Sequence, residues 1–177
     1  MNTIAFTTET ALGKAPAVLN YLPLDSPVGT LRLWSNGRQL VRIEFNAPDA
    51  APAGARRQGD AVLQRGGEQL EEYFAGKRRI FDLPLAPRGT AFQLSVWRAL
   101  AGIPWGQWRS YGDIARALGR PRAVRAVGAA NGRNPLPIVV PCHRVVGSDG
   151  SLTGFAGGLE TKRYLLELEG SLRQLQG

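Results

Sequence analysis

The only cysteine of this chain, Cys142, directly precedes its only histidine, His143, inside the apolar segment 138–146. A cysteine reacts as its thiolate, which nearby cationic groups stabilise, and here His143 and Arg144 follow at once. The plainer alternative is an inert core residue, because free cysteine usually behaves as a small buried hydrophobe. Pro141 fixes its own φ and donates no hydrogen bond. We therefore expect the apolar run to end at the cysteine in a turn, which favours a reactive thiol.

The adjacency of the two residues limits the chemistry. Neighbouring side chains on an extended strand point to opposite faces, so the pair needs either a backbone turn or a bridging water to exchange a proton. Hydrolytic cysteine enzymes take their base from a histidine that is distant in sequence, and this chain has no second histidine. The sequence therefore disfavours a papain-like or caspase-like hydrolase and leaves a stoichiometric or a redox use of the thiol open.

The composition is that of a folded protein with a basic surface. Its 177 residues are 44% hydrophobic, enough for one large domain or two small ones. The lone cysteine excludes an intramolecular disulfide framework, leaves no credible zinc cluster with a single histidine, and fits a reducing cytoplasm. The net charge of +8 and a pI near 10.5 indicate a polyanionic partner, the alternative being a merely soluble basic protein. We find no export signal and no membrane span.

The N-terminal half predicts a small sheet and one helix. Turn signals and alternating apolar residues over 21–45 predict two or three strands in an antiparallel meander. Residues 47–57 are rich in alanine and proline without periodicity, which predicts a loop. Residues 60–76 carry apolar side chains at helical spacing and predict an amphipathic helix. The pattern changes near Pro87, where we place a domain boundary.

The C-terminal half predicts short helices. One covers residues 92–101, and a second covers 110–118 and begins with Ser110 and Asp113 at the spacing of a capping box. After a Gly-Arg-Pro break, residues 122–131 predict a third helix with Val124 and Val127 facing inward. The last two helices together match a helix-turn-helix pattern.

The outer face of the predicted helix 122–131 is made of alanines and a glycine, with Arg122 and Arg125 among them. Such a face can bring the helix backbone close to another surface. We interpret it as a nucleic-acid contact made through phosphates and shape, with an arginine as a wedge. The alternative is a helix packed tightly against its own protein.

Several motifs of the C-terminal half occur together and in a fixed order. They are Ser110-Tyr111-Gly112, Arg125-Ala126-Val127-Gly128, Asn134-Pro135, Pro141-Cys142-His143-Arg144-Val145, Gly157-Gly158-Leu159 and Leu168-Glu169-Gly170. With these motifs the stretch 92–170 resembles the catalytic domain of the O6-alkylguanine-DNA alkyltransferases, also called methylated-DNA–protein-cysteine methyltransferases. The N-terminal half matches the family more loosely.

This resemblance implies an α+β chain of two domains. Residues 1–87 would form an RNase H-like α/β domain, within which residues 1–20 lie outside the resemblance as an extension. Residues 88–177 would form a mostly helical, winged helix-turn-helix-like domain that binds DNA and carries the catalytic cysteine.

The resemblance also implies DNA repair by direct reversal. Cys142 would take an alkyl group from O6 of guanine, and from O4 of thymine, irreversibly and once per molecule, without a cofactor. His143 would accept the thiol proton through a water, with Glu169 orienting the imidazole, so the adjacency of the two residues needs no direct contact. Asn134 would hold the turn that carries the site, and Tyr111 would donate a proton to the departing guanine.

The partner implied by the resemblance is double-stranded DNA containing O6-alkylguanine. The helix-turn-helix would bind the minor groove, and the damaged nucleotide would be flipped out of the stack. The carbonyls of Cys142 and Val145 would read the guanine edge, and the loop around Phe155 and Ala156 would wall the pocket. Arg125 would fill the vacated space in the duplex. The other DNA contacts would be Ala126, Gly128, Gly112, Arg120 and Ser148.

Two departures from the family pattern matter. Some relatives bind a structural zinc ion in the N-terminal domain, whereas this chain lacks the ligands, so we expect no metal. Ala156 stands where some members have serine, which removes a side-chain donor near the guanine and leaves the tolerance of bulky alkyl groups open. We further expect a monomer in solution, located in the cytoplasm and associated with the nucleoid through DNA, without membrane contact; cooperative binding on DNA stays open.

Two other classes of function compete with this one. A DNA-binding protein without enzymatic activity, either a regulator or a lesion sensor of the alkyltransferase-like kind, would use the helix-turn-helix alone. Those sensors generally lack the cysteine, so Cys142 favours the alkyltransferase. A redox switch would use a lone thiol of low pKa and would need no alkylated DNA.

Overall fold

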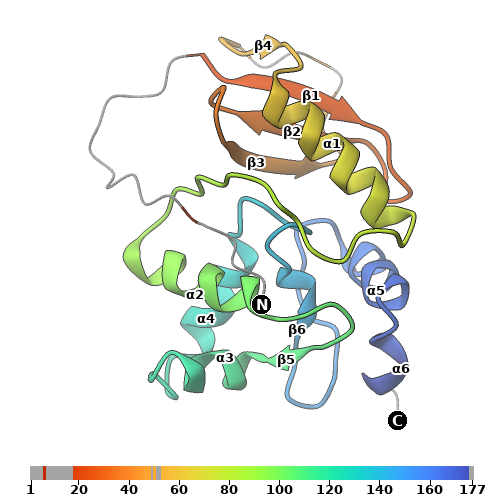
Figure 1. The fold of residues 1–177 in the computed structure, drawn as a ribbon. Coiled ribbons are helices and arrows are strands. Elements are labelled where there is room, and N and C mark those ends of the chain that lie inside the picture. The colour runs from red at the N-terminus through yellow and green to blue at the C-terminus, as the bar shows by residue number, and fades with distance from the viewer. Residues whose placement is uncertain (1–5, 7–17, 49, 51–52, 176–177) are drawn as a thin grey trace. The chain divides into compact units, whose positions relative to one another are not determined.

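The computed structural model describes residues 6, 18–48, 50 and 53–175. The chain forms two compact units, which meet in the sequence between Arg88 and Gly89. The first unit contains a sheet and a helix, and the second contains short helices and a two-stranded pairing (Figure 1). The predicted α+β class is confirmed. Within the described part of the chain, no helix combines the length and the apolar character that crossing a membrane requires.

The sheet of the N-terminal unit is a meander with one added edge strand. β1 (Asn20–Leu24), β2 (Leu31–Ser35) and β3 (Leu40–Phe45) pair antiparallel in sequence order, which confirms the prediction for residues 21–45. β4 (Arg56–Arg57) pairs parallel with β1 at the other edge, so the strand order is β3-β2-β1-β4.

The prediction of a loop over residues 47–57 is wrong at its last two residues, which form β4. Two residues are too few to show a periodicity in the sequence. They become a strand because the edge of β1 offers backbone partners: the Arg56 N–H donates to the Leu19 carbonyl at 2.9 Å.

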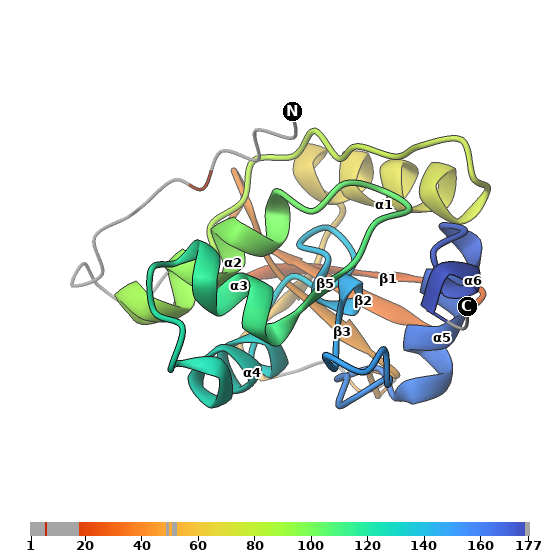
Figure 2. The same cartoon turned by 90° about the horizontal axis from the view of Figure 1, so that it is seen from below.

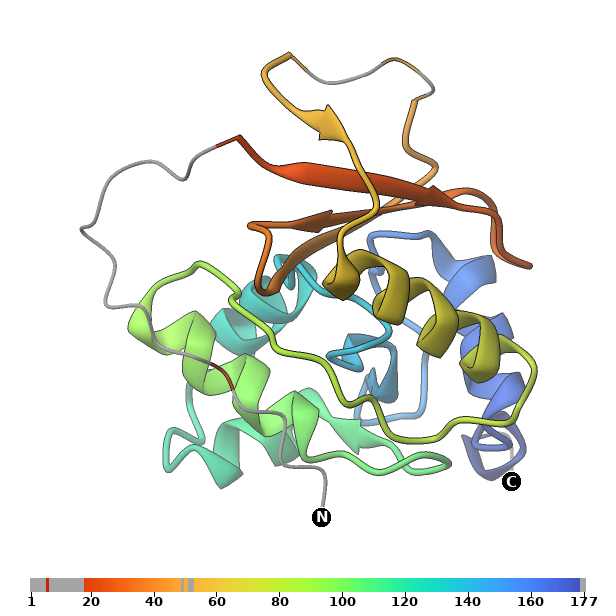
Figure 3. The ribbon, with the colours of Figure 1, turned by 45° about the horizontal axis from the view of Figure 1, so that its top comes forward.

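One helix lies along this sheet (Figure 3). α1 (Ala61–Phe74) begins at the N-cap Asp60, whose carboxylate accepts from the Leu63 N–H at 2.9 Å, and this confirms the helix predicted over 60–76. Gly66 allows a close approach to the sheet, because a Cβ at this position would lie 3.2 Å from a methyl group of Leu33. The core beneath the helix is apolar and includes the fully buried Leu31, Leu33, Leu40, Leu63 and Leu70.

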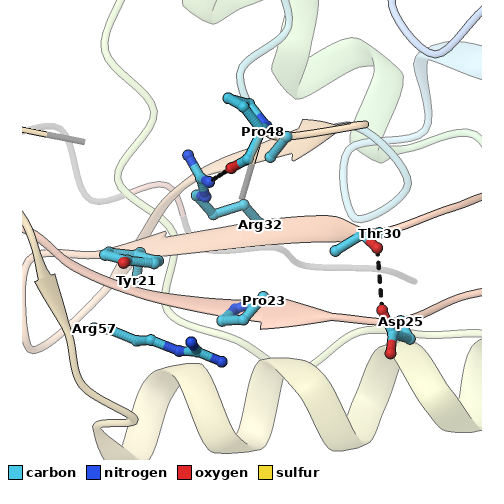
Figure 4. Close-up of a pocket in the computed structure, with 8 residues that line it drawn as sticks. Tyr21, Pro23, Asp25, Thr30, Arg32, Pro48 and Arg57 are labelled. Atoms are coloured by element: carbon cyan, nitrogen blue, oxygen red, sulfur yellow. Dashed lines mark hydrogen bonds between the residues drawn. The ribbon is translucent and has the colours of Figure 1, made fainter. Parts of the chain in front are cut away.

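A pocket of about 410 Å³ lies on this unit, between β1, β2 and the segment that follows β3 (Figure 4). Arg32 in its wall donates to the Pro48 carbonyl, and Thr30 donates to Asp25 at 3.0 Å. None of the candidate site residues found in the sequence lines this pocket. This pocket is therefore not the candidate active site.

Three helices pack together in the C-terminal unit: α2 (Ala91–Ala101), α3 (Tyr111–Ala117) and α4 (Val124–Gly132) (Figure 2). α3 begins with the predicted capping box. The Asp113 N–H donates to Ser110 Oγ at 3.0 Å, and the Asp113 carboxylate accepts from the Ser110 N–H at 2.8 Å. α3, the turn and α4 form the predicted helix-turn-helix.

The pair Val124 and Val127 does not behave as predicted. Val127 is fully buried, whereas Val124 is 40% exposed, so the prediction that both face inward is wrong. α4 begins only at Val124, and no earlier helical turn covers its side chain. Three residues also rotate an α-helix by about 300°, which places Val124 at the edge of the buried face.

The remaining elements surround the cysteine. β5 (Arg109–Ser110) pairs in parallel with β6 (Val145–Val146), which ties the start of α3 to the segment after Cys142. A 3₁₀ turn, η1 (Cys142–Arg144), directly precedes β6. α5 (Leu159–Leu168) contacts η1 and is followed by α6 (Leu172–Leu175).

Candidate active site

The backbone turns at Cys142, as the position of Pro141 predicted. The Cys142 N–H donates to the Val140 carbonyl at 2.8 Å, and residues 142–144 continue as η1. Residues 136–146 are all buried. Because Cys142 and His143 belong to a turn and not to an extended strand, the alternation of side chains between opposite faces does not apply to them.

Asn134 holds the segment that leads into this turn. Its Nδ2 donates to the Val140 carbonyl at 2.7 Å, and its Oδ1 accepts from the Leu136 N–H at 3.0 Å. Between these points Ile138 has a φ of 73°, in the left-handed region that β-branched residues rarely adopt. Such a conformation persists only where the surrounding contacts fix it, and the two hydrogen bonds of Asn134 span it.

The Cys142 thiol is 4% exposed and protonated at neutral pH. Burial raises its pKa to about 11, against the smaller opposing effects of a hydrogen bond with Asn134 and the charge of Lys162. The expectation that His143 and Arg144 stabilise a thiolate is wrong for the resting protein, because both side chains bind Glu169. Reaction at Cys142 therefore requires a base that removes the thiol proton.

His143 is the base that the geometry offers. The ring is fully buried, and its Nε2 lies 2.7 Å from Glu169 Oε1. Burial lowers the pKa of His143 in spite of the opposing charge of Glu169, so the ring is neutral. Among the described residues, Nδ1 has no hydrogen-bond partner. An imidazole held by a carboxylate through one nitrogen can accept a proton at the other, directly or through a water.

Arg144 fixes the carboxylate that holds the imidazole. Its Nε donates to Glu169 Oε2 at 2.8 Å, its Nη2 donates to Oε1 at 2.9 Å, and its Nη1 donates to the Ile103 carbonyl. Burial acts to raise the pKa of Glu169, but His143 and Arg144 together outweigh it and hold that pKa well below its usual range. Glu169 is therefore ionised, and its orientation is set by a bidentate guanidinium.

Lys162 on α5 is a buried cation that the sequence reasoning missed. Its Nζ donates to the Val145 carbonyl at 2.6 Å and to the Thr153 carbonyl at 2.9 Å. Burial lowers its pKa to about 8, and its charge is the one that acts on Cys142. A signal was available in the sequence: Lys162 precedes Leu165 by three residues and Leu166 by four, which places it on the buried stripe of an amphipathic helix.

Tyr111, the first residue of α3, is half-buried, and its phenol oxygen accepts from Thr153 Oγ1 at 2.9 Å. Burial raises the pKa of Tyr111, and the hydrogen bond from Thr153 partly opposes that shift. The phenol is therefore protonated at neutral pH, as a proton donor must be. A charge on Cys142 would raise the same pKa further, so the phenol lies within electrostatic reach of the thiol.

The two carbonyls expected to read a guanine edge already accept hydrogen bonds. The Cys142 carbonyl accepts from Asn131 Nδ2 at 3.5 Å, and the Val145 carbonyl accepts from Lys162. A carbonyl oxygen has two lone pairs, and both are engaged at Cys142, because this carbonyl also accepts from the Val145 N–H at the end of η1. Phe155 is half-buried and Ala156 is exposed, and both lie in the loop between β6 and α5.

The residues expected to contact DNA lie on the helix-turn-helix and on the loop after β6. Arg120, Arg125, Ala126 and Ser148 are exposed, whereas Gly112 and Gly128 are half-buried. The small-residue face of α4 is open at Ala126 and Ala129, while Val127, Ala130 and Asn131 form the buried face. The small residues are thus divided: Ala126 and Ala129 are open to a partner, whereas Ala130 packs inside the unit.

The surface near this helix is basic. Residues 89–177 contain 11 of the 22 basic residues of the chain but only 5 of its 14 acidic residues. A hollow of about 410 Å³ at the turn between α3 and α4 is lined by residues 120–123, and the Arg120 guanidinium lies 5.5 Å from the centre of the Phe92 ring. The described residues contain no group of three or more candidate metal ligands.

Two family models match this chain. The model for the ribonuclease-like domain of 6-O-methylguanine DNA methyltransferase matches residues 19–87, and the model for the DNA binding domain of the same methyltransferase matches residues 91–171. Together they account for most of both compact units.

Individual relatives cover nearly the whole chain. The methylated-DNA–protein-cysteine methyltransferase of Methanosarcina acetivorans is 46% identical over 158 residues, which is 85% of this chain and 98% of that protein. The protein of the same name from Haemophilus influenzae is 45% identical and covers 85% of this chain and 86% of its own length. The crystal structure of Mycobacterium tuberculosis OGT in complex with DNA is similar with a TM-score of 0.79 and 46% identity, covering 86% of this chain and 94% of that chain.

Proposed function

This chain belongs to the methylated-DNA–protein-cysteine methyltransferase family, and on that premise we propose that it repairs DNA by direct reversal. It transfers a methyl or larger alkyl group from O6 of guanine, and from O4 of thymine, irreversibly to Cys142. The observation that supports this most strongly is the buried Cys142 thiol followed in η1 by a neutral imidazole whose Nδ1 has no partner among the described residues.

The reaction balances with groups of this chain. His143 takes the thiol proton through a water, and the ionised Glu169 stabilises the imidazolium that forms. The thiolate, near the charge of Lys162, attacks the alkyl carbon: a carbon–sulfur bond forms and the carbon–oxygen bond to guanine breaks. Tyr111 gives its proton to the departing base, which leaves neutral. The phenolate then takes up a proton from solvent and the imidazolium of His143 releases one, so both groups return to their resting states. A thioether is not displaced readily, so each molecule acts once.

The proposed substrate pocket lies against the same turn. The carbonyls of Cys142 and Val145 read the edge of the base, and Phe155 and Ala156 line the wall. Asn134 keeps the turn in the shape that presents the thiol, through its hydrogen bonds to Val140 and Leu136.

Access to this pocket requires base flipping, because a thiol that is 4% exposed cannot reach a base inside a duplex. We propose that α4 enters the minor groove with its small-residue face and that Arg125 replaces the flipped base in the stack. The remaining contacts are Ala126, Gly128, Gly112, Arg120 and Ser148. The exposure of Arg125 and Ala126, and the basic surface of residues 89–177, support this placement.

Two rival functions are less well supported. A redox switch needs a thiolate at neutral pH, and burial raises the pKa of Cys142 to about 11. A sensor or regulator that only binds DNA has no use for the assembly of Cys142, His143 and Glu169 in the protein interior.

The proposal includes further expectations about the whole protein. Residues 1–87 and 88–177 act as the RNase H-like and the catalytic domain of a monomer that works on double-stranded DNA in the cytoplasm. The reaction uses no cofactor and no metal. Stoichiometric zinc in the purified protein, measured by atomic emission, would contradict the last expectation.

The direct test is conversion of the lesion. A duplex containing O6-methylguanine is incubated with the wild-type chain or with Cys142→Ala, and the digested nucleosides are separated by chromatography. We expect the wild type to restore guanine, and the variant to bind the duplex but leave the lesion unchanged. Restoration of guanine by the variant, or tight binding by the wild type without conversion, would overturn the assignment.

A further inference from the structure

Thr153 makes two hydrogen bonds that link three parts of the active site. Its Oγ1 donates to the Tyr111 phenol oxygen at 2.9 Å, and its carbonyl accepts from Lys162 Nζ at 2.9 Å. Tyr111 lies 42 residues earlier, on α3, and Lys162 lies on α5. None of the motifs in the sequence drew attention to Thr153, and the reaction described above assigns it no role.

Which of the two hydroxyl groups donates determines how Thr153 can influence proton donation by Tyr111. A phenol has one hydrogen to donate and two lone pairs that accept. When Thr153 donates to the phenol oxygen, the hydrogen of Tyr111 stays available for another acceptor. After Tyr111 has given up that hydrogen, the same bond becomes a charge-assisted hydrogen bond to a phenolate, which is the stronger kind.

Lys162 keeps the threonine in place. Its buried ammonium group binds the Thr153 carbonyl and the Val145 carbonyl, so the loop between β6 and α5 is fastened to the residue that follows η1. Thr153 itself is exposed and would otherwise depend on loop backbone alone for its position. The threonine hydroxyl is thus held toward Tyr111 by an anchor within the site.

We propose that Thr153 is a positioning residue that makes Tyr111 an effective proton donor to the departing guanine. The inference rests on the proposed function and deepens it. As the carbon–oxygen bond breaks, the proton moves from Tyr111 to the base, and the Thr153 hydroxyl stabilises the phenolate left behind until solvent returns a proton. An interaction that is stronger in the transition state than in the resting protein speeds the chemical step.

The test separates proton donation from general support of the loop by changing the leaving group. Guanine leaving from free O6-benzylguanine needs a proton, whereas iodide leaving from iodoacetamide does not. We expect both reagents to alkylate Cys142 without DNA. Rate constants are measured by mass spectrometry for Thr153→Val, Thr153→Ser and Tyr111→Phe in the full-length chain. Thr161→Val on α5 serves as the matched control, since no hydrogen bond of its side chain appears among the described residues.

We expect Thr153→Val to lower the rate with O6-benzylguanine about tenfold, the loss that corresponds to one hydrogen bond to a developing charge. The rate with iodoacetamide should stay within about twofold, and Thr153→Ser should restore most of the O6-benzylguanine rate. In the Tyr111→Phe background, Thr153→Val should cause no further loss, because the two residues act through one step.

Three results would overturn the inference. Equal losses of rate with both reagents would mean that Thr153 only supports the loop. Additive losses in the double variant would mean that it does not act through Tyr111. An unchanged O6-benzylguanine rate in Tyr111→Phe would remove the proton-donor step as well, whereas failure of the wild-type chain to react with O6-benzylguanine would count against the proposed function itself.

Discussion

Two buried cations near the cysteine act on different partners. Arg144 places a bidentate guanidinium on Glu169, which suits the planar geometry of that side chain. Lys162 binds two carbonyls as a point charge and lies close enough to act on Cys142. Arg144, two positions after the thiol, therefore orients the carboxylate that holds the base, and Lys162, 20 positions after the thiol, supplies the charge.

The pair of His143 and Glu169 gives a prediction for the pH dependence of stability. Burial lowers the pKa of His143 in the folded protein, so near pH 6.5 the unfolded chain binds a proton that the folded chain does not bind. The pKa of Glu169 is also lowered, so the stability that its ionised carboxylate contributes is likewise lost as the pH falls, but at lower pH. Each group should make the free energy of unfolding fall by up to about 1.4 kcal/mol per pH unit as the pH decreases.

Urea unfolding between pH 7.5 and pH 5 measures this effect. We expect His143→Gln to flatten the decline between pH 6.5 and pH 5, because the amide does not titrate. A slope in the variant as steep as that of the wild type would show that His143 is not the group responsible.

At the scale of elements, the site depends on an irregular segment and not on a helix or strand. Residues 134–140 connect α4 to η1 and carry Ile138 at a φ of 73° with 1% of its surface exposed. The burial of this side chain, worth roughly 1.5–3 kcal/mol, exceeds the cost of about 1–2 kcal/mol for the left-handed conformation. Asn134 supplies the hydrogen bonds that fix the remaining backbone.

Asn134→Ala should lower the free energy of unfolding by roughly 2–3 kcal/mol, because two hydrogen bonds are lost and the buried Leu136 N–H is left without its acceptor. It should also slow the alkylation of Cys142, since the hydrogen bond from Asn134 opposes the rise in the thiol pKa. Asn36→Ala is the control: Asn36 likewise makes two side-chain hydrogen bonds to the backbone, both accepted by its Oδ1, but in a turn of the N-terminal unit. A loss of stability no larger than that of the control, with unchanged alkylation, would contradict the role of Asn134.

The regular elements could be predicted from the sequence because their signals are local. The capping box at Ser110 and Asp113, and the alternation over β1 to β3, lie within a few residues of one another. The predictions failed where a residue's partner is distant in the sequence, and where a residue lies exposed at the end of a helix. β4 exists only beside β1, Val124 is uncovered because the helix starts there, and Thr153 meets Tyr111 across 42 residues. The family motifs named Cys142, His143 and Glu169, but they did not indicate Lys162 as the nearby charge.

At the scale of the whole molecule, the charge is concentrated in one half of the chain. Of the 14 acidic residues only 5 fall in residues 89–177, against 11 basic residues. The N-terminal residues are closer to neutral. Binding to a polyanion should therefore be driven by the unit that carries the helix-turn-helix, and it should weaken as salt increases.

Arg125→Ala should separate DNA recognition from chemistry. If Arg125 acts as the wedge, its loss should slow repair of O6-methylguanine in a duplex by at least about tenfold and leave the reaction with free O6-benzylguanine unchanged. Arg38→Ala removes the same charge from an exposed turn of the N-terminal unit and should affect neither reaction by more than about twofold. Equal losses on duplex and free base would argue against the wedge.

The central claim, a single irreversible transfer to Cys142, is tested most directly by mass spectrometry of the intact protein and its peptides. The chain is incubated with an excess of duplex containing O6-methylguanine, and the modification is followed to completion. The account predicts one methyl group per molecule, located at Cys142, with no further change as more substrate is added. Continued turnover without a modified protein, or a methyl group at another residue, would contradict it.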